Sequence, residues 1–299
     1  MNYKSILAAI VLSASFSCVT SCSEEDLSSE SVIVVKQTND TSFDLWLKEN
    51  FLKPYNIQFK YRFEQNEADM NYYTVPAKLR DAIKMAHIVK HLCVETYNEV
   101  AGEDFTKSNF PKMFFLIGEW EYNNNGTFIL GTAEGGKKIM LSGLNYLTQH
   151  LWNADELNDY YIRTIHHEFT HILNQTVPYQ TDFKLVTDKG YVVDNWSSEP
   201  YESEYLQNGF VSAYAQKTHE EDFAETLSLY VTNTPEWWDA LLAVPGCNAA
   251  AIRAKLDYVR DYMEDSWGVD IDLLRSVIIR RQSEIIDGKV SLDDITLNN

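Results

Sequence analysis

His167-Glu168-Phe169-Thr170-His171 is the stretch of this 299-residue chain that decides the interpretation of its fold and chemistry. Apolar residues around it recur with helical spacing, which predicts a helix from Asp159 to Leu173. Histidines four residues apart on a helix project from one face and can bind one metal ion. Glu168 would then lie beside the metal, where its carboxylate can take a proton from a metal-activated water.

Two histidines do not complete a catalytic zinc site, because three protein ligands and one open position are the usual arrangement. A metzincin would carry a further histidine six residues after His171, where Val177 stands, so that class is excluded. Glu221 and Glu225 are four residues apart on a helix predicted from Glu220 to Val231. One of the two can bind the metal while the other holds a ligand histidine by a hydrogen bond. Their neighbours Glu220 and Asp222 are expected to be an acidic first turn that complements the helix dipole.

The spacing of these residues resembles the gluzincin clan, and in particular the peptidase domain of anthrax lethal factor. In that pattern a tyrosine stands seven residues before the glutamate ligand and a second carboxylate four residues after it, which are the positions of Tyr214 and Glu225. The resemblance implies that His167, His171 and Glu221 bind Zn²⁺. It also implies that Glu168 is the general base toward a zinc-activated water, that Tyr214 donates a hydrogen bond to the oxyanion, and that Glu225 orients a ligand histidine.

A second resemblance covers most of the chain and includes its opening segment from Trp46 to Arg62. This part is similar to a group of bacterial lipoproteins described as zinc-binding metallopeptidases, often encoded beside outer-membrane glycan-uptake systems. It implies a protein or peptide substrate and a neighbouring outer-membrane uptake system as a partner.

The N-terminus carries a lysine, a short apolar run from Ile6 to Leu12, and small residues that lead to Cys22. This order is typical of a secretory signal, and the approach to the cysteine resembles the lipobox of bacterial lipoproteins. We therefore expect residues 1–21 to be a signal peptide, Cys22 to be lipidated, and residues 22–40 to be a flexible tether. The acidic run after Cys22 resembles a surface-export signal of Gram-negative gut anaerobes, which predicts an outer-membrane lipoprotein exposed at the cell surface.

The remaining residues 41–299 are expected to form one α+β domain with a zincin-like fold. We expect a small mixed sheet from residues 55–142, then the helix with the two histidines, then a helical C-terminal part. The segment from Lys138 to Leu141 is expected to be the edge strand that could pair with an extended peptide. A long helix is predicted from Pro76 to Val100, with His87 and His91 on its solvated face.

Charge and cysteine content limit the remaining possibilities. A net charge of -19 makes nucleic acid a poor partner, because phosphates would be repelled. Cys93 and Cys247 are too few for a disulfide scaffold, and their pairing stays open. The sequence thus predicts a surface-anchored zinc metallopeptidase. One alternative is a catalytically weak, zinc-containing binding module for nutrient uptake. Glu168 argues against it, because structural zinc needs no adjacent base. The other alternative is a zinc hydrolase that acts on other amides or on esters.

Overall fold

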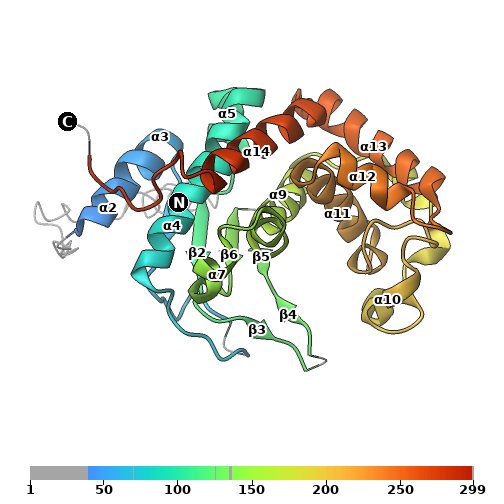
Figure 1. Cartoon of the computed structure of the whole chain (residues 1–299), viewed down its shortest axis with the longest axis horizontal. Helices are drawn as coiled ribbons and strands as arrows, with labels where there is room; N and C mark the ends of the chain where they lie inside the picture. Colours follow the sequence, from blue (N-terminus) through green and yellow to red (C-terminus); the bar gives the residue numbers. More distant parts are fainter. Residues whose placement is uncertain (1–39, 70, 125, 135–136, 298–299) are drawn as a thin grey trace, which may run out of the picture. The chain divides into compact units, whose positions relative to one another are not determined.

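The computed structural model describes residues 40–69, 71–124, 126–134 and 137–297 (Figure 1). The expected signal peptide, lipidated Cys22 and nearly all of the tether lie outside these residues. Within the described part, no helix is long and apolar enough to cross a membrane. Cys93 and Cys247 are both free thiols in that part, so they do not pair with each other.

A four-stranded mixed sheet forms the β part of the fold. Its order is β1 (Gln58–Lys60), β2 (Met113–Leu116), β6 (Lys138–Leu141) and β5 (Gly131–Glu134). The first three strands are parallel, and β5 runs antiparallel to β6. A separate hairpin pairs β3 (Glu121–Tyr122) with β4 (Phe128–Ile129).

The prediction that Lys138 to Leu141 is the edge strand is wrong. This strand, β6, is paired on both sides, with β2 and with β5. The preceding strand folds back on it and covers its free side, so β5 is the edge. Two antiparallel neighbouring strands can be joined by a short turn, so β5 and β6 can follow each other directly in the chain.

Two long helical runs stand before and after β1 in the chain, and each contains a π-helical segment. One helical run joins α2 (Ser42–Leu47), the π-helical segment η1 (Lys48–Leu52) and α3 (Lys53–Tyr55). A second joins α4 (Leu79–Val89), the π-helical η2 (Lys90–Val94) and α5 (Glu95–Ala101), and α6 (Glu103–Asn109) follows it. The second run begins three residues later than predicted, because Pro76 instead forms a β-bridge with Ile117.

The prediction that His87 and His91 face solvent is also wrong. The ring of Trp46 lies 4.3 Å from the ring of His87, centroid to centroid. His91 lies 2.9 Å from a carboxylate oxygen of Glu284, which belongs to the last helix of the chain. Helices from other parts of the chain therefore cover the polar face of the helix that carries His87 and His91, which local periodicity predicts to be exposed to solvent.

The helical part that follows the sheet positions the histidines. A continuous run joins α8 (Ala154–Leu157), the π-helical η4 (Asn158–Ile162) and α9 (Arg163–Thr176), and α11 (His219–Thr232) packs along α9. Short helical turns lie before and between them: η3 (Leu144–Tyr146), α7 (Leu147–His150), η5 (Thr181–Leu185), η6 (Asp188–Gly190), η7 (Val193–Ser197), α10 (Tyr201–Glu204) and η8 (Tyr214–Gln216). The chain ends with α12 (Pro235–Leu242), α13 (Ala249–Trp267) and α14 (Ile271–Ile286), and Figure 1 shows α14 (red) returning beside α5.

The core explains why the helix with the two histidines lies where it does. Phe169, between the histidines in sequence, is 1% exposed and packs edge-on against Tyr97 and Phe110, each with ring centroids 5.0 Å away. Burying a side chain of this size stabilises a fold by about 1.5–3 kcal/mol. The apolar face of α9 is thus fixed in the core, and the opposite face is left for the histidines. The fold is the expected α+β class, mostly helical with a small mixed sheet.

Candidate metal centre

Helix α9 presents His167 and His171 on one face, one helical turn apart. The neighbouring His166 points the other way, into the core, where its Nδ1 lies 3.0 Å from the hydroxyl of Tyr97. The two adjacent histidines thus lie on different faces of α9, and His166 is off the ligand face.

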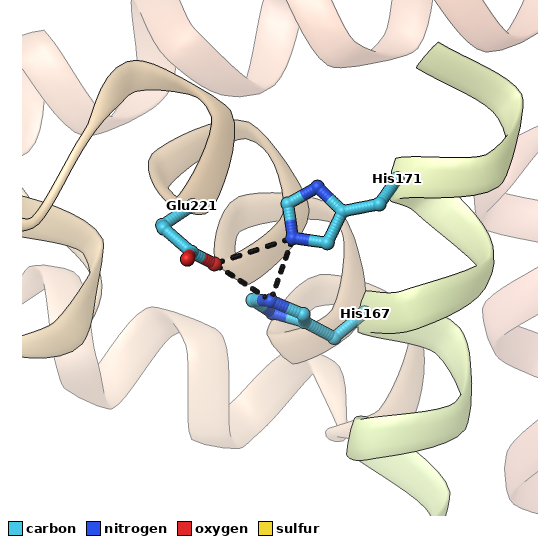
Figure 2. A group of neighbouring side chains, drawn as sticks. All are labelled: His167, His171 and Glu221. Carbon is cyan, nitrogen blue, oxygen red and sulfur yellow. Dashed lines mark hydrogen bonds and ion pairs between the residues drawn. The ribbon is translucent and has the colours of Figure 1, made fainter. Parts of the chain in front are cut away.

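Helix α11 brings Glu221 to the same point. Thr218 caps this helix, its hydroxyl accepting a hydrogen bond from the backbone N–H of Glu221. Oε2 of Glu221 lies 3.0 Å from Nε2 of His167 and 3.2 Å from Nε2 of His171, and the two nitrogens are 3.1 Å apart (Figure 2). Among the described residues, these three form a group whose donor atoms could hold one metal ion.

The spacing of the three donor atoms fits zinc. Ligand atoms about 2.0–2.1 Å from a tetrahedral zinc lie about 3.3–3.4 Å from one another, close to the triangle seen here. Two imidazoles and one carboxylate are also a donor set that zinc takes in hydrolytic sites. The residues present therefore fit the ion in both chemistry and separation.

Electrostatics at this point favour a positive charge. Burial alone would lower the pKa of His167, but the carboxylates of Glu221 and Glu225 outweigh it and raise the pKa to about 10. Burial alone would likewise raise the pKa of Glu221, but the two histidines hold it well below its usual range. The site thus stabilises a cation among these groups, whether a proton or a metal ion.

Glu225 lies behind His167 and not at the donor triangle. Its Oε1 is 2.8 Å from Nδ1 of His167, and its Oε2 accepts a hydrogen bond of 2.6 Å from the hydroxyl of Ser212. Burial would raise the pKa of Glu225, but Arg163 and these hydrogen bonds lower it to about 2. A carboxylate at this position accepts a hydrogen bond from Nδ1–H and so leaves the lone pair of Nε2 facing the other donors. The structure therefore separates the roles that the sequence left open between Glu221 and Glu225.

Glu168 and Tyr214 lie beside the donor triangle on the wall of the same cleft. Burial raises the pKa of Glu168 above its usual value, although a hydrogen bond with the backbone of Ala133 on β5 opposes the shift. The hydroxyl of Tyr214 donates to Oε1 of Glu221 at 2.8 Å. Burial and the charge of Glu221 raise the pKa of Tyr214 far above its usual value, so it stays a hydrogen-bond donor.

The cleft in front of these residues has a volume of about 910 Å³. One wall is the edge strand β5 with the β3–β4 hairpin, and the other is the segment that carries Trp196 and Tyr214. The ring of Trp196 packs edge-on against that of Tyr214, with centroids 5.0 Å apart. The apolar lining of the cleft includes Phe128, Ile129 and Leu130, and such a lining suits an extended ligand with apolar side chains.

Sequence reasoning missed several contacts of this site. Lys217 donates hydrogen bonds to both Tyr214 and Glu221. Its position four residues before Glu221 is the sequence pattern from which the contact with Glu221 could have been predicted. Asp222 lies in the acidic first turn of α11, as predicted, but it is fully buried, and one carboxylate oxygen lies 2.7 Å from the ammonium of the equally buried Lys255. Glu220 lies in the same turn and is exposed.

The relationship to known proteins agrees with this geometry. A sequence model of the family described as "Putative zinc-binding metallo-peptidase" matches residues 36–272. The chain belongs to this family. Its cofactor is zinc, in keeping with the donor triangle. No curated protein matches the chain.

A solved structure gives the same result. It is described as a "putative zinc-binding metallo-peptidase from Bacteroides caccae ATCC 43185", and it is 39% identical in sequence with a TM-score of 0.73. The similarity covers 89% of this chain and all of that one. The family relationship therefore extends over most of the described domain, well beyond the short motif.

Proposed function

We propose that this protein is a zincin-like peptidase of the gluzincin type, in which His167, His171 and Glu221 hold zinc and Glu225 orients His167. The observation that carries the proposal is the donor triangle with the half-buried carboxylate of Glu168 beside it, all on one cleft. A purely structural zinc site has no need of an adjacent base or of an open cleft.

The residues of the site divide the work of peptide hydrolysis. Zinc, when bound, supplies a Lewis acid that polarises the substrate carbonyl and eases the ionisation of water. Glu168, with its raised pKa, accepts the proton of the attacking water and later passes it to the leaving amine. Tyr214 keeps its proton and donates a hydrogen bond to the oxygen on which negative charge develops.

The substrate class follows from the cleft. Strand β5 is the sheet edge that lines it, so an extended peptide can add to β5 as a further strand. The expected partner is therefore a protein or peptide in extended form, held by backbone hydrogen bonds and by the apolar lining.

The test is the Glu168→Gln variant, assayed with a library of extended peptides. We expect it to keep one equivalent of zinc and to lose turnover by several orders of magnitude, because the amide cannot take a proton. The matched control is Glu220→Gln, an exposed acid on α11, which should cleave as the wild type does. Cleavage by Glu168→Gln as fast as by the wild type would contradict the role of Glu168 as general base, whereas a lack of cleavage by both would favour a zinc-containing binding module.

We further propose that the mature protein begins at Cys22 and is held at the cell surface by lipid, with residues 22–40 as tether and 41–299 as the peptidase domain. The support is the order of basic, apolar and small residues before Cys22. Cells fed an alkyne fatty acid should label the wild type and not Cys22→Ser. Labelling of both would refute the anchor, and resistance of the wild type to protease added to intact cells would refute surface exposure.

A further inference from the structure

Two polar side chains, Tyr214 and Lys217, meet at the carboxylate oxygen of Glu221 that faces away from the histidines. Tyr214 donates to this Oε1 at 2.8 Å, and Nζ of Lys217 donates to it at 3.1 Å. The same ammonium also donates to the hydroxyl oxygen of Tyr214 at 3.1 Å. The three groups close a small ring of hydrogen bonds on the side of Glu221 opposite the donor triangle.

This ring poses a conflict for Tyr214. Its hydroxyl has one proton, and that proton is engaged by Glu221. It cannot serve Glu221 and the oxyanion of a substrate at once. When it turns to the substrate, a buried carboxylate oxygen loses a partner, which is costly unless another donor remains.

Lys217 is that other donor. An ammonium group carries three N–H bonds, so Lys217 can stay bound to Oε1 while Tyr214 turns away. Glu221 then keeps Oε2 directed at His167 and His171 throughout.

We propose that Lys217 is a positioning residue of the reaction: it holds the outer oxygen of Glu221 and so frees the hydroxyl of Tyr214 for the oxyanion. This inference rests on the proposed peptidase function, but the part that concerns the position of Glu221 depends on metal binding alone.

The segment that carries Lys217 is itself held in place. The backbone carbonyl of Lys217 accepts a hydrogen bond of 3.1 Å from Val193, and that of Gln216 one of 2.8 Å from Val192. Val193 has φ 52, a left-handed conformation that a β-branched residue rarely adopts. The contacts between the two segments keep Lys217 and Tyr214 directed at the cleft, which both of them line.

An ordinary surface pair between a lysine and a glutamate four residues apart would do none of this. Here the side chain of Glu221 is 14% exposed, and the ammonium contacts a second functional group as well. Lys107 and Glu103 on α6 offer the ordinary case, with side chains 42% and 63% exposed, and serve as the control.

The experiment compares Lys217→Met, Tyr214→Phe and the double variant, with Lys107→Met as control. At saturating zinc, Lys217→Met should lower kcat about 10–100-fold with KM nearly unchanged. Tyr214→Phe should lower kcat about 100-fold, and the double variant should be no worse than Tyr214→Phe alone, because Lys217 acts through Tyr214. Losses that multiply in the double variant, or a loss confined to KM, would overturn the proposal.

Zinc affinity gives a readout that does not depend on turnover. In competition with a chelator, Lys217→Met should bind zinc about tenfold more weakly, while Lys107→Met should match the wild type. Unchanged zinc affinity in Lys217→Met would overturn the claim on Glu221. If the wild type turns over no faster than Glu168→Gln, the peptidase proposal fails, and the zinc competition still decides whether Lys217 positions Glu221.

Discussion

Glu225 shows how a residue outside the donor triangle can decide whether metal binds. It is 5% exposed and takes the Nδ1 side of His167. Replacing it by glutamine keeps the shape and removes the charge that raises the basicity of the imidazole. We expect Glu225→Gln to bind zinc about 10–100-fold more weakly in chelator competition. Glu220→Gln on the same helix should bind as the wild type, and equal affinity of the two variants would contradict the role of Glu225.

Sequence patterns identified the residues of the site better than their partners. His167 and His171 are predictable because one helical turn places them together, and the structure brings Glu221 to the same point as expected. The pairing of Asp222 with Lys255 was not predictable, because the two residues are on different helices and nothing local distinguishes Asp222 from an exposed acid. Burial of a charge is decided by tertiary packing, which local periodicity does not contain.

At the scale of elements, the close approach of β5 to α9 depends on Gly131. A Cβ at this position would lie 2.6 Å from the carbonyl oxygen of Met140 and 2.7 Å from Cγ2 of Thr164. Gly131→Ala should therefore destabilise the fold by about 1–3 kcal/mol, measured by chemical denaturation. It should also lower turnover, since β5 carries the Ala133 backbone group that contacts Glu168.

A second substitution checks the cause of that loss. Thr164→Ser removes the crowded methyl group, so the double variant Gly131→Ala, Thr164→Ser should recover part of the stability. If Gly131→Ala alone is as stable as the wild type, the strand and the helix do not need this contact.

At the scale of elements, prediction from the sequence succeeded for the long helices and failed for the order of the strands. The helices α9 and α11 agree with their predicted spans to within a few residues, because their apolar periodicity is sustained over several turns. The C-terminal part is helical, as expected. The choice of β6 as the edge strand failed because strand order depends on pairing between distant segments. A short apolar strand looks alike in sequence whether it has one neighbour or two.

At the scale of the whole molecule, the proposed zinc ligands lie on two helices that are about fifty residues apart in sequence. Helix α11 also packs along α9 and is buried over most of its length, with residues such as Phe223 fully buried, so the metal-free chain should stay folded. Zinc at about 100 times its dissociation constant should raise the free energy of unfolding by about 2.7 kcal/mol. A chelator should lower the melting temperature accordingly, and an unchanged melting temperature would argue that α9 and α11 need no metal to hold them.

The pH dependence of that stabilisation follows from His167. In the metal-free protein its neighbouring carboxylates raise its pKa to about 10, whereas an unfolded histidine has a pKa of about 6.5. The stabilisation that His167 gives as a cation is therefore complete below about pH 6.5 and is lost as the pH rises through about 10. Zinc takes the place of this proton, so its advantage grows over the same interval. The difference in melting temperature between zinc-loaded and chelator-treated protein should widen from about pH 7 to about pH 9.

Calorimetry near pH 8, in buffers of different ionisation enthalpy, should show roughly one proton released per zinc. A difference that stays constant across this range, with no proton released, would show that His167 is already neutral before the metal binds.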